Sequence, residues 1–485
     1  MKKFISISTI VVLLLATAMY YGSLNKTTSP PAPTPTPQPV VNTPVPVPQE
    51  AKPVTSLSSA GTLTLTSAIS QGYMLKGQTN EMYATVDIKA IAHKSLKRPP
   101  LNVALVIDRS GSMGGDKIQY AKQAARRLVG MLDSQDRVAI VSYGSDVDVN
   151  FGSRPVNAMN REQMLNAIDR IEVSGGTNLS GGFERGLREV QSWNNSQAIN
   201  RVLLMSDGNA NIGVTYLPEL RKMSSKALSG GVSLSTIGVG LDYNEDLMTA
   251  MANEGAGNYY FVDNATSIAQ SFEQELKGLS SSVAKDSALV IKLAPGVSLG
   301  ELYGFPYRQQ GDSIMIPLDA FYSEQSKNVL LKLNVPADAV DSRQVMDVQL
   351  SYTDLVNKNA TKQQNVALSS VVTTDQNKAS TSIDRNVIAR VQQVEVATSM
   401  NKAMDMYSEG NAQEAVQLMK RQQSKMRRAR KKYDLKGSDF DRVDNEINTM
   451  NADMVQNAPS SASGRKMVKS KKARSNYIVF DSAKF

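Results

Sequence analysis

The sequence predicts an α/β fold in which a doubly wound, mostly parallel sheet is inserted in a β-sandwich and followed by a helical C-terminal region. Over residues 99–282, apolar strands alternate with amphipathic helices, which is typical of a parallel sheet covered on both faces. Segments of alternating polarity flank this region at 57–98 and 283–375. Helical periodicity follows over 385–455. At 485 residues, the chain is long enough for two or three domains.

A leader and a tether are expected to precede the folded part. Two lysines and an apolar run over residues 4–22 give the segment 1–22 the layout of an export signal. The run is also near the length that spans a bilayer, so cleavage after Ala18 and an uncleaved membrane anchor remain alternatives. Closely spaced prolines in residues 23–56 favour an extended polyproline II linker. We expect an exported protein in the periplasm or at the cell surface, with or without a tether to the cytoplasmic membrane.

The two flanking regions are expected to form a single β-sandwich. The two strands that precede the central region cannot form a stable sheet alone, and segments of the same character recur after it. The central domain is then an insertion in the sandwich. The expected strands are 62–70, 83–92, 288–295, 313–318, 328–336, 344–353 and 363–372.

The central domain, 99–282, is expected to bind any ligand at the carboxyl ends of its strands, where doubly wound sheets form their binding crevice. The expected strands are 102–107, 137–143, 201–206, 232–239 and 259–262. The expected helices are 115–132, 161–173, 180–193, 217–229, 244–254 and 266–282.

The C-terminal region is predicted to be a helical hairpin over 385–455, broken near Gly410, and a disordered basic tail over 456–485. Residues 420–432 hold eight Lys/Arg and residues 465–474 hold six, with no acidic residue in either run. We interpret these runs as a solvated helix face and part of the tail, with anionic lipid or wall polymer as alternative partners. Nucleic acid is not expected, because no aromatic residues interleave with the charges to stack on bases.

Composition excludes several kinds of site. The chain has no cysteine and a single histidine, so disulfides, thiolate zinc sites and cysteine nucleophiles are impossible and a Ser-His-Asp triad is hard to build. Neither Gly-x-Gly-x-x-Gly nor Gly-Lys-Ser/Thr occurs, so nucleotide binding is not expected. The enzyme alternative is a serine-lysine hydrolase that uses Ser282 and Lys285, but no second motif supports it. We therefore do not expect an enzyme.

Oxygen-bearing side chains follow three segments of the central domain. Asp108, Ser110 and Ser112 follow its first strand, Thr177 lies in the loop before the helix at 180, and Asp207 follows the strand at 201–206. The edge of a doubly wound sheet brings such residues together. Carboxylates and hydroxyls suit a hard divalent cation, so Mg²⁺ is the expected ion, with Mn²⁺ or Ca²⁺ as alternatives. An outside carboxylate could complete its octahedron.

This pattern resembles the von Willebrand factor type A (VWA) family, whose metal-ion-dependent adhesion site reads Asp-x-Ser-x-Ser, then Thr, then Asp-Gly. All five positions match. The resemblance implies that Ser110, Ser112 and Thr177 contact the metal directly, while Asp108 and Asp207 act directly or through water. More loosely, the whole chain is similar to bacterial VWA proteins related to inter-alpha-trypsin inhibitor heavy chains and often labelled calcium-activated chloride channel homologues. No apolar run of spanning length follows the leader, so ion conduction is not expected.

The sequence therefore predicts an extracytoplasmic protein whose metal binds an acidic side chain of a protein partner, in adhesion or envelope assembly. Arg109, beside the expected metal, would either help to hold that acidic group or be solvated, and we favour solvation. The alternative function is a structural envelope component whose metal only stabilises the domain.

Overall fold

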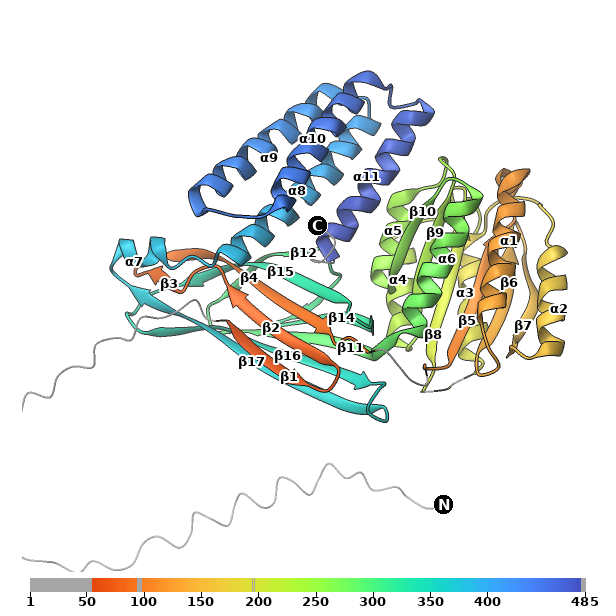
Figure 1. Ribbon diagram of the computed structural model, residues 1–485, viewed down its shortest axis with the longest axis horizontal. Coiled ribbons are helices and arrows are strands. Elements are labelled where there is room, and N and C mark those ends of the chain that lie inside the picture. Colours follow the sequence, from red (N-terminus) through yellow and green to blue (C-terminus); the bar gives the residue numbers. More distant parts are fainter. Residues whose placement is uncertain (1–54, 94–97, 194, 196, 481–485) are drawn as a thin grey trace, which may run out of the picture. The chain divides into compact units, whose positions relative to one another are not determined.

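The computed structural model describes residues 55–93, 98–193, 195 and 197–480 (Figure 1). The expected leader and nearly all of the expected linker lie outside the described residues. Among the helices that are described, none combines the length and the apolar character needed to cross a membrane.

The central sheet has six strands in the order β10-β9-β8-β5-β6-β7 (Figure 1). All neighbours are parallel except β7, which runs antiparallel to β6. The strands are β5 (Leu101–Asp108), β6 (Arg137–Tyr143), β7 (Val147–Pro155), β8 (Ile199–Ser206), β9 (Ser233–Val239) and β10 (Ala256–Val262). The edge strand β7 was not expected from the sequence, because it buries only Phe151 and so shows no clear apolar pattern.

Helices cover both faces of this sheet because β5 is apolar on both sides. Leu105 and Ile107 belong to one core with α1, α2 and α6, while Ala104 and Val106 belong to another with α3, α4 and α5. The helices are α1 (Asp116–Met131), α2 (Ala158–Asp169), α3 (Leu179–Gln191), α4 (Leu217–Ser229), α5 (Glu245–Glu254) and α6 (Ala265–Ser280).

Strands from before and after the central domain form two further sheets that share one core. The first, in the order β1-β2-β4-β15-β12, contains β1 (Ser56–Ala60), β2 (Leu63–Ile69), β4 (Thr79–Ala90), β15 (Ser326–Pro336) and β12 (Ser298–Tyr303). The second, in the order β13-β14-β11-β16-β17-β3, contains β13 (Arg308–Gln310), β14 (Ser313–Tyr322), β11 (Ser282–Leu293), β16 (Ser342–Asp354), β17 (Ala360–Thr373) and β3 (Tyr73–Leu75). The antiparallel pairing of β4 with β15 joins the two flanks, so the expected insertion in a β-sandwich is confirmed.

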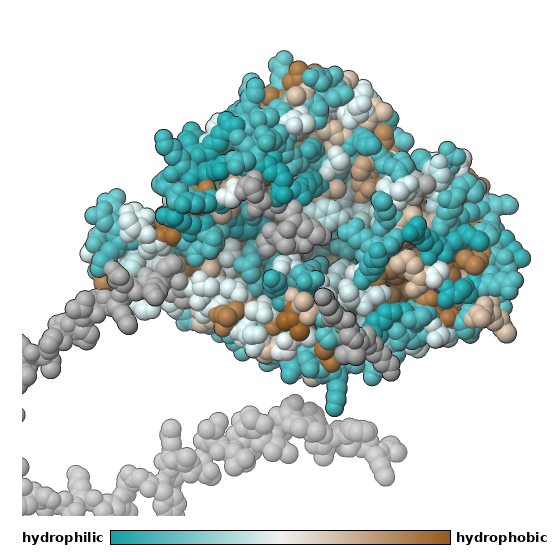
Figure 2. Space-filling model, in the orientation of Figure 1, coloured by the Kyte–Doolittle hydropathy of each residue, from teal (hydrophilic) through white to brown (hydrophobic). Residues whose placement is uncertain are grey.

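The elements that the structure describes after β17 are helices. These are α7 (Gln376–Thr381), α8 (Arg385–Ser408), α9 (Ala412–Tyr433), α10 (Ser438–Gln456) and α11 (Ala462–Phe480). The break between α8 and α9 occurs at Gly410, whose φ of 93° suits glycine. Most side chains on the outer face of α9 are exposed and basic, and Figure 2 shows a hydrophilic surface over the helical region.

The prediction of a disordered tail over 456–485 is wrong for the residues of α11. This helix buries Met467, Val468, Ile478 and Val479 in the core of the helical region. Lys469 and Lys472 of this helix are buried as well, because acidic residues more than 60 positions away in sequence neutralise them. A sequence pattern that lacks local acidic residues could not reveal those partners.

Candidate metal centre

The five residues expected to hold a metal lie at the point where the order of the central strands reverses. After β5 the chain continues to β6 on one side, and β8 later pairs with the other side of β5. The carboxyl ends of β5 and β8 therefore border the crevice in which sheets of this kind bind ligands. Asp108 ends β5, and Asp207 directly follows β8.

Asp108 is fully buried and held by two hydrogen bonds. The backbone N–H of Ser110 donates to its Oδ1 at 2.8 Å, and the hydroxyl of Ser206 donates to its Oδ2 at 2.7 Å. Burial raises the pKa of Asp108 above its usual value; the hydrogen bonds from Ser110 and Ser206 oppose this rise, and the nearby charge of Asp207 adds to it. Ser206 links the ends of the two strands, a role that the sequence pattern did not reveal.

The two serines and Asp207 are within hydrogen-bonding distance of one another. The hydroxyl oxygens of Ser110 and Ser112 are 3.1 Å apart, and the hydroxyl of Ser112 donates to Oδ1 of Asp207 at 2.8 Å. The short 3₁₀ helix Gly111–Met113 brings these serines to the same side of the turn. Asp207 is fully buried, whereas Ser112 is exposed, so the cluster opens to solvent on the side of Ser112.

Thr177 joins this cluster through contacts between loops. Gly111 N–H donates to the carbonyl oxygen of Gly175 at 3.0 Å, which fixes the loop before α3 beside the serine turn. Asn211 holds Thr177 on the other side, because its Oδ1 accepts from the N–H of Thr177 at 2.8 Å. A Cβ built on Gly208 would lie 3.3 Å from Oγ of Ser112 and 3.7 Å from Oγ1 of Thr177. Both hydroxyls therefore border the same small space, which glycine leaves open.

The donor atoms suit a hard divalent cation. Two carboxylates and three hydroxyls supply only oxygen, as Mg²⁺ prefers. Among the described residues, no three Asp, Glu or His side chains form a metal-binding cluster, so charge neutralisation would rest on Asp108 and Asp207 alone. Such a site has few protein ligands and would leave coordination positions for water or a partner's carboxylate.

Lys117 is a member of this site that the sequence analysis missed. Its Nζ lies 2.5 Å from Oδ2 of Asp207 and donates to the carbonyl oxygen of Ser112 at 3.2 Å. Lys117 lies in the first turn of α1, and Asp207 is 90 positions away in sequence. The signal available in the sequence was a lysine at the start of the helix that follows the Asp-x-Ser-x-Ser turn.

Arg109 is not solvated, contrary to the reading that we favoured. Its guanidinium pairs with Asp148 at 2.8 Å, and its side chain is only 13% exposed. Asp148 lies on the unexpected strand β7, so the sequence offered no partner for Arg109.

Ser282 and Lys285 each donate a hydrogen bond to a backbone carbonyl oxygen. The hydroxyl of Ser282 donates to the carbonyl oxygen of Gly278 at 3.4 Å, and Nζ of Lys285 donates to that of Ala198 at 3.1 Å. These contacts give no support to a serine-lysine hydrolase.

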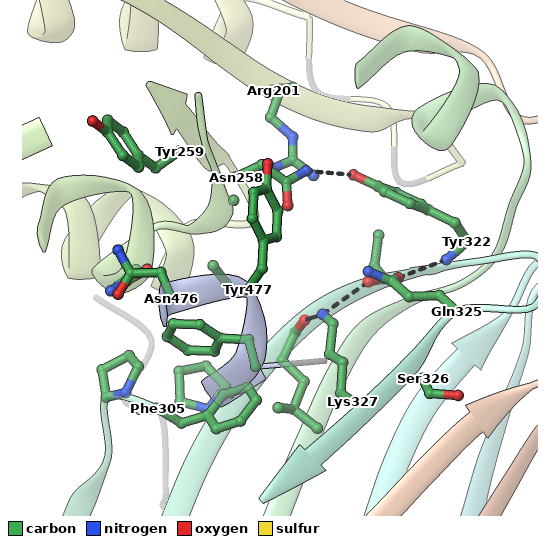
Figure 3. A pocket seen from close by; sticks show the side chains of 18 of the residues that line it. Arg201, Asn258, Tyr259, Phe305, Tyr322, Gln325, Ser326, Lys327, Asn476 and Tyr477 are labelled. Atoms are coloured by element: carbon green, nitrogen blue, oxygen red, sulfur yellow. Dashed lines mark hydrogen bonds between the residues drawn. The ribbon is translucent and has the colours of Figure 1, made fainter. Parts of the chain in front are cut away.

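A cavity of about 110 Å³ lies away from this cluster, where β10, the sandwich and α11 meet (Figure 3). Tyr322 and Phe305 of the sandwich and Tyr477 of α11 line it, beside the buried Arg201 of β8. The charge of Arg201 is matched by Asp319 at 3.3 Å and Glu275 at 3.6 Å. Because Arg201 is paired with carboxylates from α6 and from the sandwich, we interpret the cavity as part of a structural joint.

Three comparisons with known proteins show what this chain is similar to. The family model described as "von Willebrand factor type A domain" matches residues 102–274. The uncharacterized protein YfbK of Escherichia coli (strain K12) is 33% identical over 212 residues, which are 43% of this chain and 36% of YfbK. Inter-alpha-trypsin inhibitor heavy chain H2 of Mus musculus is 26% identical over 185 residues, 36% of this chain and 19% of the heavy chain. This chain thus matches well under half of either relative's length.

The likeness in structure extends further along the chain. A solved structure, "von Willebrand factor type A from Catenulispora acidiphila", superposes with a TM-score of 0.68 at 16% identity and covers 87% of this chain and 98% of its own. At that identity the likeness shows a shared fold. It reaches beyond the central domain into the flanking regions.

Proposed function

Residues 102–274 form a von Willebrand factor type A domain, and from this premise we propose that the chain is an extracytoplasmic, metal-dependent protein-binding protein. Domains of this type are generally involved in protein–protein interaction and adhesion. The proposed partner carries an acidic side chain that reaches the metal centre, in adhesion or in assembly of the cell envelope. The export-like segment 1–22 supports a location outside the cytoplasm.

The clustering of three hydroxyls and two buried carboxylates at the reversal point is the observation that carries this proposal. Ser110, Ser112 and Thr177 would hold the ion, and Asp108 and Asp207 would balance its charge. A bound divalent cation would supply an electrophile for an outside carboxylate. The exposure of Ser112 leaves a route by which that carboxylate could reach the site.

The partner's chemistry can be tested before the partner is known. The full-length chain is applied to an array in which each Asp- or Glu-containing peptide is matched by its Asn or Gln counterpart. We expect acidic members to bind in Mg²⁺, and their amide counterparts to bind weakly. Chelation with EDTA and the Asp108→Ala variant should both abolish the binding.

Two outcomes would contradict the proposal. Equal binding to acidic and amide peptides would show that the site does not recognise a carboxylate of the partner. Binding that persists in EDTA and in Asp108→Ala, together with a lowered melting temperature of that variant, would instead favour a structural component whose metal only stabilises the domain.

A further inference from the structure

Lys117 places a positive charge beside the proposed metal centre. Its ammonium group contacts Oδ2 of Asp207 at 2.5 Å, while Oδ1 of the same carboxylate accepts from Ser112. Lys117 therefore contacts the carboxylate oxygen of Asp207 that does not accept from Ser112, and it also donates to the carbonyl oxygen of Ser112 at 3.2 Å. Its side chain is 30% exposed, so the ammonium lies near the solvent-facing rim of the site and keeps part of its hydration.

The loop after β9 leaves room for this lysine. Gly240 has a φ of 78°, and a Cβ on it would lie 3.3 Å from Cε of Lys117. A side chain at position 240 would be strained by its backbone and would crowd Lys117. The contact between Lys117 and Asp207 therefore depends on the first turn of α1, the loop after β8 and the loop after β9.

The charges of the site follow from these contacts. Asp108 and Asp207 are fully buried, and as ligands of a cation they would supply two negative charges, one of which Lys117 offsets. The other nearby cation, Arg109, is paired with Asp148. The formal charge of a divalent cation would balance the two carboxylates, so Lys117 would leave the loaded site with one net positive charge.

We propose that Lys117 sets the charge balance of the metal centre, weakening its hold on the cation and strengthening its attraction for an acidic partner. This inference rests on the proposed function. A carboxylate approaching a neutral loaded site would gain little from long-range attraction, whereas a positive site attracts it. Lys117 acts on the ion through Asp207 and on the partner through its own charge.

The sign of the change in metal affinity separates this role from a purely structural one. If Lys117 served only to position Asp207, its loss would loosen that carboxylate and weaken metal binding. If Lys117 sets the charge, its loss makes the site more negative and strengthens metal binding. We expect roughly tenfold tighter Mg²⁺ binding, a modest change for a unit charge at this distance because the ammonium is partly hydrated.

The test is calorimetric titration of Mg²⁺ into the full-length chain and three variants. Lys117→Met should bind Mg²⁺ roughly tenfold more tightly than wild type, and Lys117→Arg, which keeps the charge, should remain close to wild type. Lys122→Met is the matched control on the same helix, because Lys122 donates a solvent-exposed hydrogen bond to the carbonyl oxygen of Asp169. At saturating Mg²⁺, Lys117→Met should also bind an acidic array peptide several-fold more weakly.

Unchanged or weaker Mg²⁺ affinity in Lys117→Met would overturn this inference, while loss of binding in Asp108→Ala would leave the proposed function standing. Absence of Mg²⁺ binding in every protein, wild type included, would overturn both. Melting curves distinguish a folded Lys117→Met from a misfolded one. If that variant fails to fold, Lys117→Gln takes its place with the same expected sign.

Discussion

Lys469 of α11 donates a hydrogen bond to the backbone carbonyl oxygen of Tyr243, at 2.9 Å, and its ammonium lies 3.9 Å from the centre of the Tyr243 ring. Tyr243 lies between β9 and α5, in the loop that follows β9. β9 ends at the same edge of the sheet as the metal centre, since it runs parallel to β8. The C-terminal helix is therefore docked on a loop that borders the proposed binding edge.

The first prediction concerns this docking. Lys472, only 9% exposed, pairs with Asp246 at 2.8 Å and Asp405 at 2.6 Å, so Lys472→Met leaves acidic groups without their cation. We expect the free energy of unfolding to fall by about 2 kcal/mol. This is less than the cost of breaking a fully buried ion pair, because both carboxylates are largely exposed. Hydrogen exchange should show faster exchange of the α11 amides. Lys466→Met, which removes an exposed pair with Asp263, is the control and should change exchange little.

The second prediction concerns acid sensitivity. Burial alone would raise the pKa of Glu245, but the hydrogen bond and charge of Lys469 and the charge of Lys472 outweigh it, so the pKa lies below its usual value. A lowered carboxyl pKa contributes stability that is present above the unfolded value, about 4.3, and is lost as the pH falls through the folded value.

The measurement is the melting temperature of wild type and Glu245→Gln between pH 7 and pH 3. Wild type should be the more stable at neutral pH, and the difference should shrink below about pH 4. A difference that stays constant down to pH 3 would show that Glu245 carries no such linkage.

The third prediction concerns the joint around the cavity in Figure 3. Arg201→Leu leaves Glu275, which is fully buried, without its cationic neighbour. We expect the free energy of unfolding to fall by about 3–5 kcal/mol, which would lower the melting temperature by roughly 10 °C. Adding Glu275→Gln should restore part of the loss, because it removes the uncompensated charge. Equal melting temperatures of wild type and Arg201→Leu would contradict a stabilising role for the joint.

The fourth prediction concerns the space beside Gly208. A methyl group there would lie 3.3 Å from Oγ of Ser112, so Gly208→Ala should displace the hydroxyl and weaken Mg²⁺ binding roughly tenfold. Titration calorimetry measures this change. Gly130→Ala is the matched control, because nothing lies within 4 Å of its added Cβ, and it should retain wild-type affinity. Full affinity in Gly208→Ala would mean that this space is not part of the metal centre.

The neighbourhood of the site residues could be predicted from local information. Asp108, Ser110, Ser112, Thr177 and Asp207 each follow or precede a periodic element, and parallel strands bring their carboxyl ends to one edge. That these residues bind a metal stays a prediction. The apolar strands of the central sheet were recognisable for the same reason. The two-sided burial of β5 requires the continuous apolar run that the sequence shows.

Features that depend on long-range contacts could not be predicted from the sequence. The order of α11 depends on Glu245 and Asp405, neither of which lies near it in sequence. The contact between Lys117 and Asp207 depends on how α1 lies against the loop after β8. Arg109 finds its partner on β7, an edge strand with little apolar pattern. Local periodicity cannot predict such pairs, because their partners lie far apart in the sequence.

The most direct test of the account is calorimetric titration of Mg²⁺ into the full-length chain and into Asp108→Ala. We predict saturable binding to a single site in the wild type and none in the variant, since Asp108 is one of the two carboxylates that would balance the ion. Equal binding by the two proteins would show that Mg²⁺ binds at a site that does not include Asp108. Absence of binding in both would mean that the cluster around Asp108 and Asp207 is a structural turn, and the proposed metal-dependent recognition would be wrong.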